Sequence, residues 1–274
     1  MFATVTATRA APPTTGLVAS APPAADDGAR WESGLAWVPE RCGIGYQLVP
    51  WCSNTDPPVY QPATTGAAYY RPVGARFAVA CSTLGGGVDP ERVHRMVEAT
   101  SPFVVARELW DGALGQTEPF TIRGETYRNA RLADPSAEIV GTGGAELLFA
   151  LGRLEQAAVE ASMGQRVMLH LPVRLTARLG DFARRVGTDL LTRSDNLVVA
   201  DAGYPGTGPT GQVVGATAWA YATTVAAVRQ SRIDLIDDPA ATVNRAVNTV
   251  TAWASRVFAA TFDPCVHFAT QINT

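Results

Sequence analysis

The sequence predicts an α+β fold, because helical patterns in the middle of the chain are followed by strand patterns toward its C-terminus. Apolar residues recur at helical spacing after Pro90 and again after Gly144, whereas the stretches 217–225 and 243–272 are rich in β-branched and aromatic residues. The chain of 274 residues is long enough to bury a substantial core, as one large domain or as two interleaved ones.

The composition excludes several classes of function. All 22 basic residues are arginine, which rules out P-loop, Schiff-base and general-base chemistry that depends on lysine. The formal net charge of -3 argues against a dedicated nucleic-acid binder, which needs a basic face. Charged residues make up only 17% of the chain, as expected for a protein whose surface is partly covered by neighbouring subunits.

The four cysteines are scattered and lack the CxxC spacing of a metal or redox motif. The N-terminus has neither a basic segment nor a continuous apolar segment, so no secretory signal is predicted. No apolar stretch approaches the length of a membrane span. We therefore expect reduced thiols in a cytoplasmic product, without membrane insertion.

Two irregular regions precede the first helical pattern. Residues 1–30 are dominated by Ala, Pro, Thr and Gly, which bury too little apolar surface to offset the entropy of ordering. They are predicted to form a flexible arm that becomes ordered only across another chain. Residues 31–75 place many Trp and Tyr among Pro and Gly, and predict extended strands and loops. These aromatic side chains suit either an interface or the chain's own core.

A short strand over 76–81 leads to the first predicted helix. Its start carries a capping residue, a proline for the first helical position and an acid for the first turn, in the order Asp89, Pro90 and Glu91. Helical spacing continues until Gly112 supplies a stop. Pro102 lies inside this pattern and removes one backbone hydrogen bond, so we expect a kink or a break near Ser101.

A second amphipathic helix is predicted over 147–161, with Gly164 as its end. Residues 166–170 have the pattern of a buried strand, and Pro172 suits the start of a third helix that runs to Phe182.

The remainder of the chain is predicted to be mostly strand. A short apolar strand over 196–200 precedes a loop rich in turn residues, 203–209. Further strands are expected within 217–225, 243–262 and 265–272.

Cys265 and His267 are the best candidates for metal ligands, since they lie two apart on a predicted strand and would face the same side. A metal site needs more than two ligands. Cys42 and Cys52 complete it only if the fold brings them close, so buried cysteines and a hydrogen-bonded histidine are the preferred interpretation.

Other candidate groups are weaker. Cys81, His94 and Asp89 lie near one another in sequence, as a cysteine nucleophile and its base would need, but Asp89 suits a helix cap and His94 an exposed helical position. The glycine-rich loop 203–211 precedes a strand and lacks the P-loop lysine. The adjacent pair Arg184-Arg185 is more typical of a helix end than of a phosphate site.

No GxSxG, HExxH or calcium-loop motif is present. The sequence therefore predicts no catalytic residue, no cofactor and no metal ligand, and a protein that is not an enzyme.

Three segments resemble those of tailed-bacteriophage major capsid proteins with the Hong Kong ninety-seven type of fold. Ala106–Gly112 resembles the end of that family's long spine helix, Val167–Pro172 resembles a strand that opens a helix, and Asn196–Gly206 resembles the strand and loop near a capsomer axis. The resemblance spans about residues 76–272 and rests on structural segments, not on catalytic motifs.

The resemblance implies four parts. Residues 1–30 would be a flexible N-terminal arm and 31–75 an extended loop region. Residues 76–140 and 236–274 would form a peripheral domain with the spine helix on a sheet, and 141–235 an axial domain.

The function implied is that of a structural protein, which joins as pentamers and hexamers into an icosahedral head around double-stranded DNA. Its location would be the virion, assembled in the host cytoplasm. Scaffolding, portal and decoration proteins are further expected partners, packaged DNA would be touched weakly and non-specifically, and an actinobacterial phage is the expected source.

Two alternatives stay open at this point. A tail or decoration protein would form rings or tubes or attach to preformed shells. An enzyme with a cysteine or histidine centre would bring Cys81, His94, Cys265 and His267 together in one pocket.

Some members of the resembled family join their subunits by an isopeptide bond between lysine and asparagine. A chain without lysine cannot form it, so its joints would be non-covalent or reinforced by other proteins.

Overall fold

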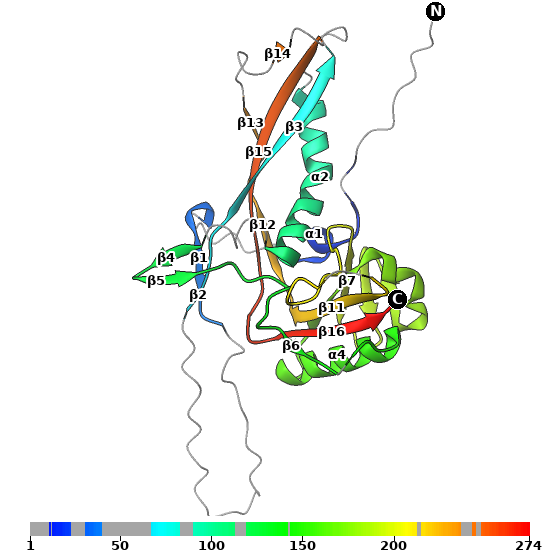
Figure 1. Ribbon diagram of the computed structural model, residues 1–274. Helices are drawn as coiled ribbons and strands as arrows, with labels where there is room; N and C mark the ends of the chain where they lie inside the picture. The colour runs from blue at the N-terminus through cyan, green and yellow to red at the C-terminus, as the bar shows by residue number, and fades with distance from the viewer. Residues whose placement is uncertain are drawn as a thin grey trace, which may run out of the picture.

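The computed structural model describes residues 11, 13–22, 31–39, 67–82, 90–112, 119–141, 143–212, 215–236, 243–244 and 248–274, with the backbone alone for 80–82, 236 and 243–244. Two sheets carry the fold (Figure 1). The longest helix lies along an elongated sheet, and a second helix packs against a seven-stranded sheet. We refer to them as the peripheral sheet and the axial sheet, after the two domains that the resemblance implies. The predicted α+β class is confirmed.

The peripheral sheet is built on one long antiparallel pair. β3 (Val73–Ser82) pairs along all of its residues with β15 (Thr249–Thr261). Three short strands are also antiparallel to β15, namely β12 (Ala227–Gln230), β13 (Asp234–Ile236) and β14 (Val243–Asn244). The strand prediction over 243–262 is confirmed by β14 and β15.

The helix α2 (Pro90–Asp111) lies along one face of this sheet (Figure 1). Pro90 is its first residue, as predicted, and Gly112 follows its end with a φ of +60°. Val93 and Val97 pack against Val79 of β3 and Ala254 of β15. The predicted cap, Asp89, lies outside the described residues.

The break expected near Ser101 is absent, because α2 continues through Pro102. A proline inside a helix costs about 3 kcal/mol, so packing must offset this cost. Pro102 is buried, and Arg256 of β15 donates a hydrogen bond of 3.0 Å to the Ser101 hydroxyl. Contacts with the sheet therefore stabilise the turn that the local sequence disfavours.

The axial sheet has seven strands, in the spatial order β6 (Glu138–Ile139), β16 (His267–Asn273), β11 (Thr217–Thr224), β7 (Val167–Pro172), β10 (Leu197–Asp201), β9 (Asp189–Thr192) and β8 (Ala183–Val186). Neighbouring strands are antiparallel except for β7 with β10 and β6 with β16. The predicted strands over 166–170 and 196–200 are confirmed as β7 and β10.

The helix α4 (Leu147–Ala161) covers one face of the axial sheet. The Glu146 side chain accepts hydrogen bonds from the backbone N–H groups of Leu148 and Phe149, at 3.1 and 3.3 Å, and so caps its first turn. Gly164, with a φ of +79°, donates its N–H to the Val159 carbonyl at 2.8 Å. The predicted helix and its stop are therefore confirmed.

Both faces of the axial sheet are buried. On β11, the small residues Ala218, Ala220 and Ala222 belong to the cluster beneath α4. Trp219 and Tyr221 point to the other face, where they pack with the C-terminal half of α2. The alternation of large and small residues that predicted this strand therefore places the small residues under α4 and the large ones against α2.

The sheet memberships differ from the predicted division into domains. β16 lies within 236–274, assigned to the peripheral domain, but pairs with β11 of the axial sheet. β12 and β13 lie largely within the predicted axial range, but pair with β15 of the peripheral sheet. Strand patterns do not reveal pairing partners, so the sequence could not locate these crossings.

The predicted third helix is wrong as an α-helix. The structure has two short 3-10 helices instead, η3 (Val173–Arg178) and η4 (Gly180–Phe182). Gly180, with a φ of +49°, has a left-handed conformation that a continuous helix cannot contain.

Part of the predicted flexible arm is ordered on its own chain, so the prediction is wrong for residues 13–22. The helix α1 (Leu17–Ser20) lies beside α2, and the Leu17 side chain is fully buried in the main core. One leucine among many small residues therefore anchors this segment.

Several short elements complete the helices and strands of the described residues. In the extended region, η1 (Trp31–Ser33) precedes β1 (Leu35–Trp37), which is antiparallel to β2 (Ala68–Tyr70). β4 (Phe120–Ile122) and β5 (Glu125–Tyr127) form a separate hairpin. Residues 40–66 of the predicted loop region lie outside the described residues.

Candidate functional site

The end of α2 is joined to the axial sheet through Trp110. This side chain is fully buried, and its indole Nε1 donates a hydrogen bond of 2.9 Å to Thr207 Oγ1 in the loop after β10. Its ring centroid lies 5.0 Å from that of Tyr204 and 4.9 Å from that of Tyr221. The Tyr221 hydroxyl donates to the Thr207 carbonyl at 2.9 Å. We refer to these four residues as the junction.

The junction brings together two of the segments that resemble capsid proteins, 106–112 and 196–206. Gly203 touches α2 so closely that an added Cβ atom would lie 2.5 Å from the Phe103 carbonyl oxygen and 2.8 Å from the Ala106 Cβ. Only glycine allows this approach. The loop therefore holds the helix against the sheet without an intervening side chain.

Asp201 fixes the N-terminal segment at the same place. Its carboxylate accepts hydrogen bonds from the backbone N–H groups of Leu17, at 2.9 Å, and Gly203, at 2.8 Å. Burial raises the pKa of Asp201, and these two hydrogen bonds oppose that rise. The carboxylate thus connects α1, β10 and the loop.

His170 lies under the junction on β7 and is fully buried. Its Nδ1 lies 3.0 Å from the Tyr204 hydroxyl and its Nε2 lies 2.9 Å from Thr223 Oγ1. Burial, and to a lesser degree the charge of His267, lowers the pKa of His170 to about 3. His170 is therefore neutral at neutral pH and serves as a hydrogen-bonding core residue.

His267 also has a structural role. Its Nε2 lies 2.8 Å from the Leu132 carbonyl oxygen, and its ring packs against Tyr221 and Phe262. Burial lowers the pKa of His267, although the bond to Leu132 opposes this effect.

The predicted metal ligands and reactive residues do not form a site in the described part of the chain. Cys265 lies in the turn before β16, not on the strand, and is disulfide-bonded, so the expected reduced state is wrong for this residue. His94 is exposed on α2 and lies 3.7 Å from Glu98. The described residues do not include Cys42, Cys52, Asp89 or the side chain of Cys81.

Among the described residues, no three His, Cys, Asp or Glu side chains lie close enough to hold a metal ion. No helix among these residues is long and apolar enough to cross a membrane.

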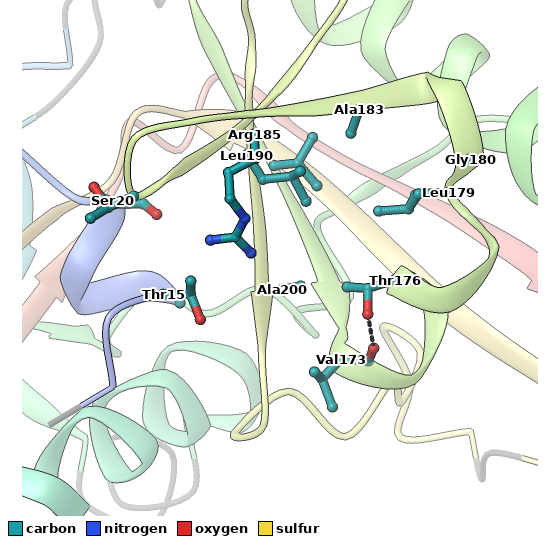
Figure 2. A pocket seen from close by; sticks show the side chains of 13 residues that line it. Thr15, Ser20, Val173, Thr176, Leu179, Gly180, Ala183, Arg185, Leu190 and Ala200 are labelled. Carbon is teal, nitrogen blue, oxygen red and sulfur yellow. Dashed lines mark hydrogen bonds between the residues drawn. The ribbon is translucent and has the colours of Figure 1, made fainter. Parts of the chain in front are cut away.

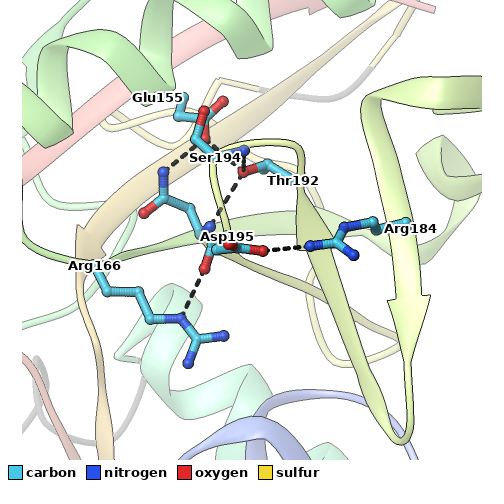
Figure 3. Close-up of polar contacts among 7 residues, drawn as sticks. Glu155, Arg166, Arg184, Thr192, Ser194 and Asp195 are labelled. Carbon is cyan, nitrogen blue, oxygen red and sulfur yellow. Dashed lines mark hydrogen bonds and ion pairs between the residues drawn. The ribbon is translucent and has the colours of Figure 1, made fainter.

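A polar network joins α4 to the turn between β9 and β10 (Figure 3). Glu155 accepts hydrogen bonds of 2.6 Å from both the Thr192 hydroxyl and the Asn196 amide. Arg166 donates to the Asp195 carbonyl at 2.9 Å, and Arg184 pairs with the Asp195 carboxylate at 2.6 Å. Arg184 thus binds a carboxylate of its own chain. The network positions the turn.

Arg185, its neighbour, points into a pocket of about 300 Å³ between α1, η3 and the β8–β9 hairpin. Figure 2 shows its guanidinium reaching from β8 toward Thr15, with Ser20 nearby. Arg185 forms no ion pair with any described residue. The pocket has hydroxyl groups and one cation, but neither a base nor a nucleophile of perturbed pKa.

Apolar side chains are exposed on both sheets and helices, which is typical of surfaces that other chains cover. On α2, Met96 and Phe103 point outward. On the peripheral sheet, Trp253 is exposed on the face opposite α2, beside Ala78 of β3. Sequence analysis missed these residues as surface positions, because an aromatic residue in a strand looks the same whether it faces a core or a partner.

No protein-family model and no curated protein matches the sequence. Solved structures do match in three dimensions. The capsid of an empty GTA particle has a TM-score of 0.58 at 10% identity, over 100% of this chain and 95% of that one. The capsid of Ralstonia phage GP4 has a TM-score of 0.52 at 10% identity, over the same shares, 100% and 95%. A chain of Gordonia phage Cozz has a TM-score of 0.49 at 14% identity, over 88% and 81%.

The similarities to the GTA capsid and to the Ralstonia phage GP4 capsid show the fold. The chain has the phage capsid fold of the Hong Kong ninety-seven type, as the resemblance implied. The predicted source in an actinobacterial phage stays a prediction.

Proposed function

We propose that this chain is the major capsid protein of a tailed phage, a non-enzymatic subunit that joins into pentamers and hexamers of an icosahedral head around double-stranded DNA. The observation that supports this most strongly is the match with two capsid structures over the full length of the chain. A match of this extent covers both sheets and the helix between them, not one common motif.

The surfaces of the subunit also support the proposal. Among the described residues, α2 covers one face of the peripheral sheet and Trp253 is exposed on the other, while the outward side of α2 carries Met96 and Phe103. An elongated element with apolar residues on two sides gains stability when neighbouring copies cover them. The axial sheet, by contrast, is a compact unit suited to the centre of a ring.

Contact with DNA would be weak. The net charge is -3, and several arginines pair with acids of the same chain, as Arg107 does with Asp111. A container must hold DNA without binding it tightly, and a mildly acidic subunit suits this role. Scaffolding, portal and decoration proteins would be further partners, in a virion assembled in the host cytoplasm.

Electron microscopy of the purified protein, alone and co-expressed with its assembly partners, tests the proposal. We expect closed shells of uniform size that protect DNA from nuclease when packaging proteins are present. Rings or tubes would favour a tail protein instead. A protein that sediments as a monomer under every assembly condition would contradict the proposal.

The joints between subunits would be non-covalent, since the chain has no lysine for an isopeptide bond. Denaturing electrophoresis in the presence of a reducing agent should therefore give a single band at the mass of one chain, 28.9 kDa. A ladder of larger bands under these conditions would contradict this part of the proposal.

A further inference from the structure

One edge of the axial sheet carries a group of exposed apolar side chains around an arginine. Ile139 on the edge strand β6 is 55% exposed, and Leu148 and Phe149 on α4 are 41% and 62% exposed. The guanidinium carbon of Arg153 lies 5.5 Å from the centre of the Phe149 ring. The same guanidinium lies over Gly141, where an added Cβ atom would be 2.9 Å away. We refer to Ile139, Leu148, Phe149 and Arg153 as the α4 patch.

The α4 patch contributes little to the fold of its own subunit. The inward side of α4 is supplied by other residues, among them Leu147, Leu151 and Leu154, which are fully buried. Aromatic residues and arginine are the types that concentrate binding energy in interfaces. Arg153 forms no ion pair within the described part of the chain. A carboxylate of another subunit could therefore pair with its guanidinium.

The opposite edge of the axial sheet offers a complementary pair. β8 is the edge strand there, and its last residue, Val186, pairs with Asp189 of β9 across a tight turn. Val186 is 47% exposed, and Asp189 forms no ion pair among the described residues. An exposed aliphatic side chain thus stands beside an unpaired carboxylate. We refer to these two residues as the hairpin tip.

We propose that the hairpin tip of one copy docks on the α4 patch of the next copy, with Val186 against Phe149 and the Asp189 carboxylate on the Arg153 guanidinium. The occupant is a second copy of this chain, because the two halves are complementary in charge and lie on opposite edges of one sheet, β6 and β8. A contact between two different surfaces of identical subunits leaves both surfaces free at the ends until a rotation closes it into a ring. This inference rests on the proposed shell function and names the contact within one ring.

A charge-reversal cycle tests the docking. Arg153→Asp and Asp189→Arg should each lower the association constant of rings at least about tenfold, since close charge pairs in interfaces couple strongly. The double variant restores the pair with its charges exchanged, and should recover most of the loss. Arg123→Asp makes the same charge change on the distant β4–β5 turn, where Arg123 is exposed, and should leave association unchanged. Sedimentation velocity measures all four variants, and circular dichroism checks that each is folded.

The outcomes separate the two proposals. Wild-type rings or shells that persist in both single variants, a double variant as weak as the singles, or an equal loss with Arg123→Asp would each overturn the docking alone. A wild-type chain that stays monomeric would overturn the shell function and the docking with it.

A second measurement does not depend on charge. Subunits with Phe149→Cys, mixed with subunits with Val186→Cys and treated with the thiol oxidant diamide, should form a disulfide-linked dimer on a non-reducing gel. Neither variant alone should form this band, because the contact joins two different surfaces. No additional dimer in the mixture would overturn the docking, even if a charge variant failed to fold.

Discussion

The two sheets of this subunit differ in how they are covered. The axial sheet is buried on both faces, by α4 and by the end of α2, whereas the peripheral sheet has α2 on one face and exposes Ala78 and Trp253 on the other. Two tryptophans on antiparallel strands illustrate the contrast: Trp219 is 6% exposed in the axial sheet and Trp253 is 37% exposed in the peripheral sheet. The two faces of the axial sheet therefore stabilise the subunit, while its edge strands carry exposed side chains such as Ile139 and Val186. The peripheral sheet exposes a tryptophan on a face of the sheet itself.

The largest expected effect comes from removing the side chain that links the two regions. Trp110→Ala should lower the free energy of unfolding by about 3–5 kcal/mol, since it leaves a cavity and removes the hydrogen bond to Thr207. Trp253→Ala, the matched control on the open face, should change it by less than about 1 kcal/mol. Urea denaturation of the two variants measures the difference. Equal losses would show that the peripheral face is as important to the fold as the junction.

Gly203→Ala should destabilise the subunit by roughly 1–3 kcal/mol, toward the upper end, because the new methyl group meets the backbone of α2. The helix and the loop would have to separate to admit it. Thermal unfolding followed by circular dichroism gives the loss. A variant as stable as the wild type would show that the close approach is not required.

Lowering the pH should decrease the free energy of unfolding, because His170 is buried in its neutral form in the axial sheet. Its pKa is about 3 in the folded chain, against an ordinary value of 6.5, so the unfolded chain binds a proton first as the pH falls. The stability due to neutral His170 is complete above pH 6.5 and decreases toward pH 3, by about 2 kcal/mol at pH 5. His267 acts in the same direction, and Asp201, whose pKa is raised, opposes them.

The difference between the wild type and His170→Gln, measured as unfolding free energy at pH 7 and pH 5, isolates this effect. His94→Gln on the exposed side of α2 is the matched control for replacing a histidine by glutamine. An unchanged slope in His170→Gln would contradict the assignment.

The smallest expected effect lies on the open face. Gly74 of β3 is exposed there, and an added Cβ atom would have no neighbour within 4 Å. Gly74→Ala should therefore raise the free energy of unfolding by about 0.5–1 kcal/mol, because it restricts the unfolded chain. The same urea titration measures it. Destabilisation would show that this face is more crowded than the described residues indicate.

Local patterns were enough to predict most helices and strands. Helical spacing of leucines predicted α4 at its observed bounds, Leu147–Ala161, and Pro90 marked the start of α2. The prediction failed where distant residues decide: Arg256, far along the chain, helps to hold the turn of Pro102, and β16 crosses into the axial sheet.

The junction could not be predicted from the sequence either, because it depends on contacts between distant residues. Trp110 and Thr207 are 97 residues apart, and nothing local in either segment specifies that contact. The two segments stood out only through their resemblance to capsid proteins, which did not say that they touch. His170 lies in the segment 167–172, which resembles a capsid strand, but that resemblance assigns the histidine no role. Its burial follows from the pairing of β7 with β10 and β11.

The three alanines of β11 form part of a core and also determine the distance between α4 and the axial sheet. Because Ala218, Ala220 and Ala222 end in methyl groups, α4 can lie close to the sheet, and the outer side of the same helix carries Phe149 and Arg153. A bulkier residue in that row would move the outer side of α4 outward in every copy. In the proposed ring of identical subunits, such a displacement would recur at each contact between neighbours. Buried alanines would then influence whether the proposed ring closes with five subunits or with six.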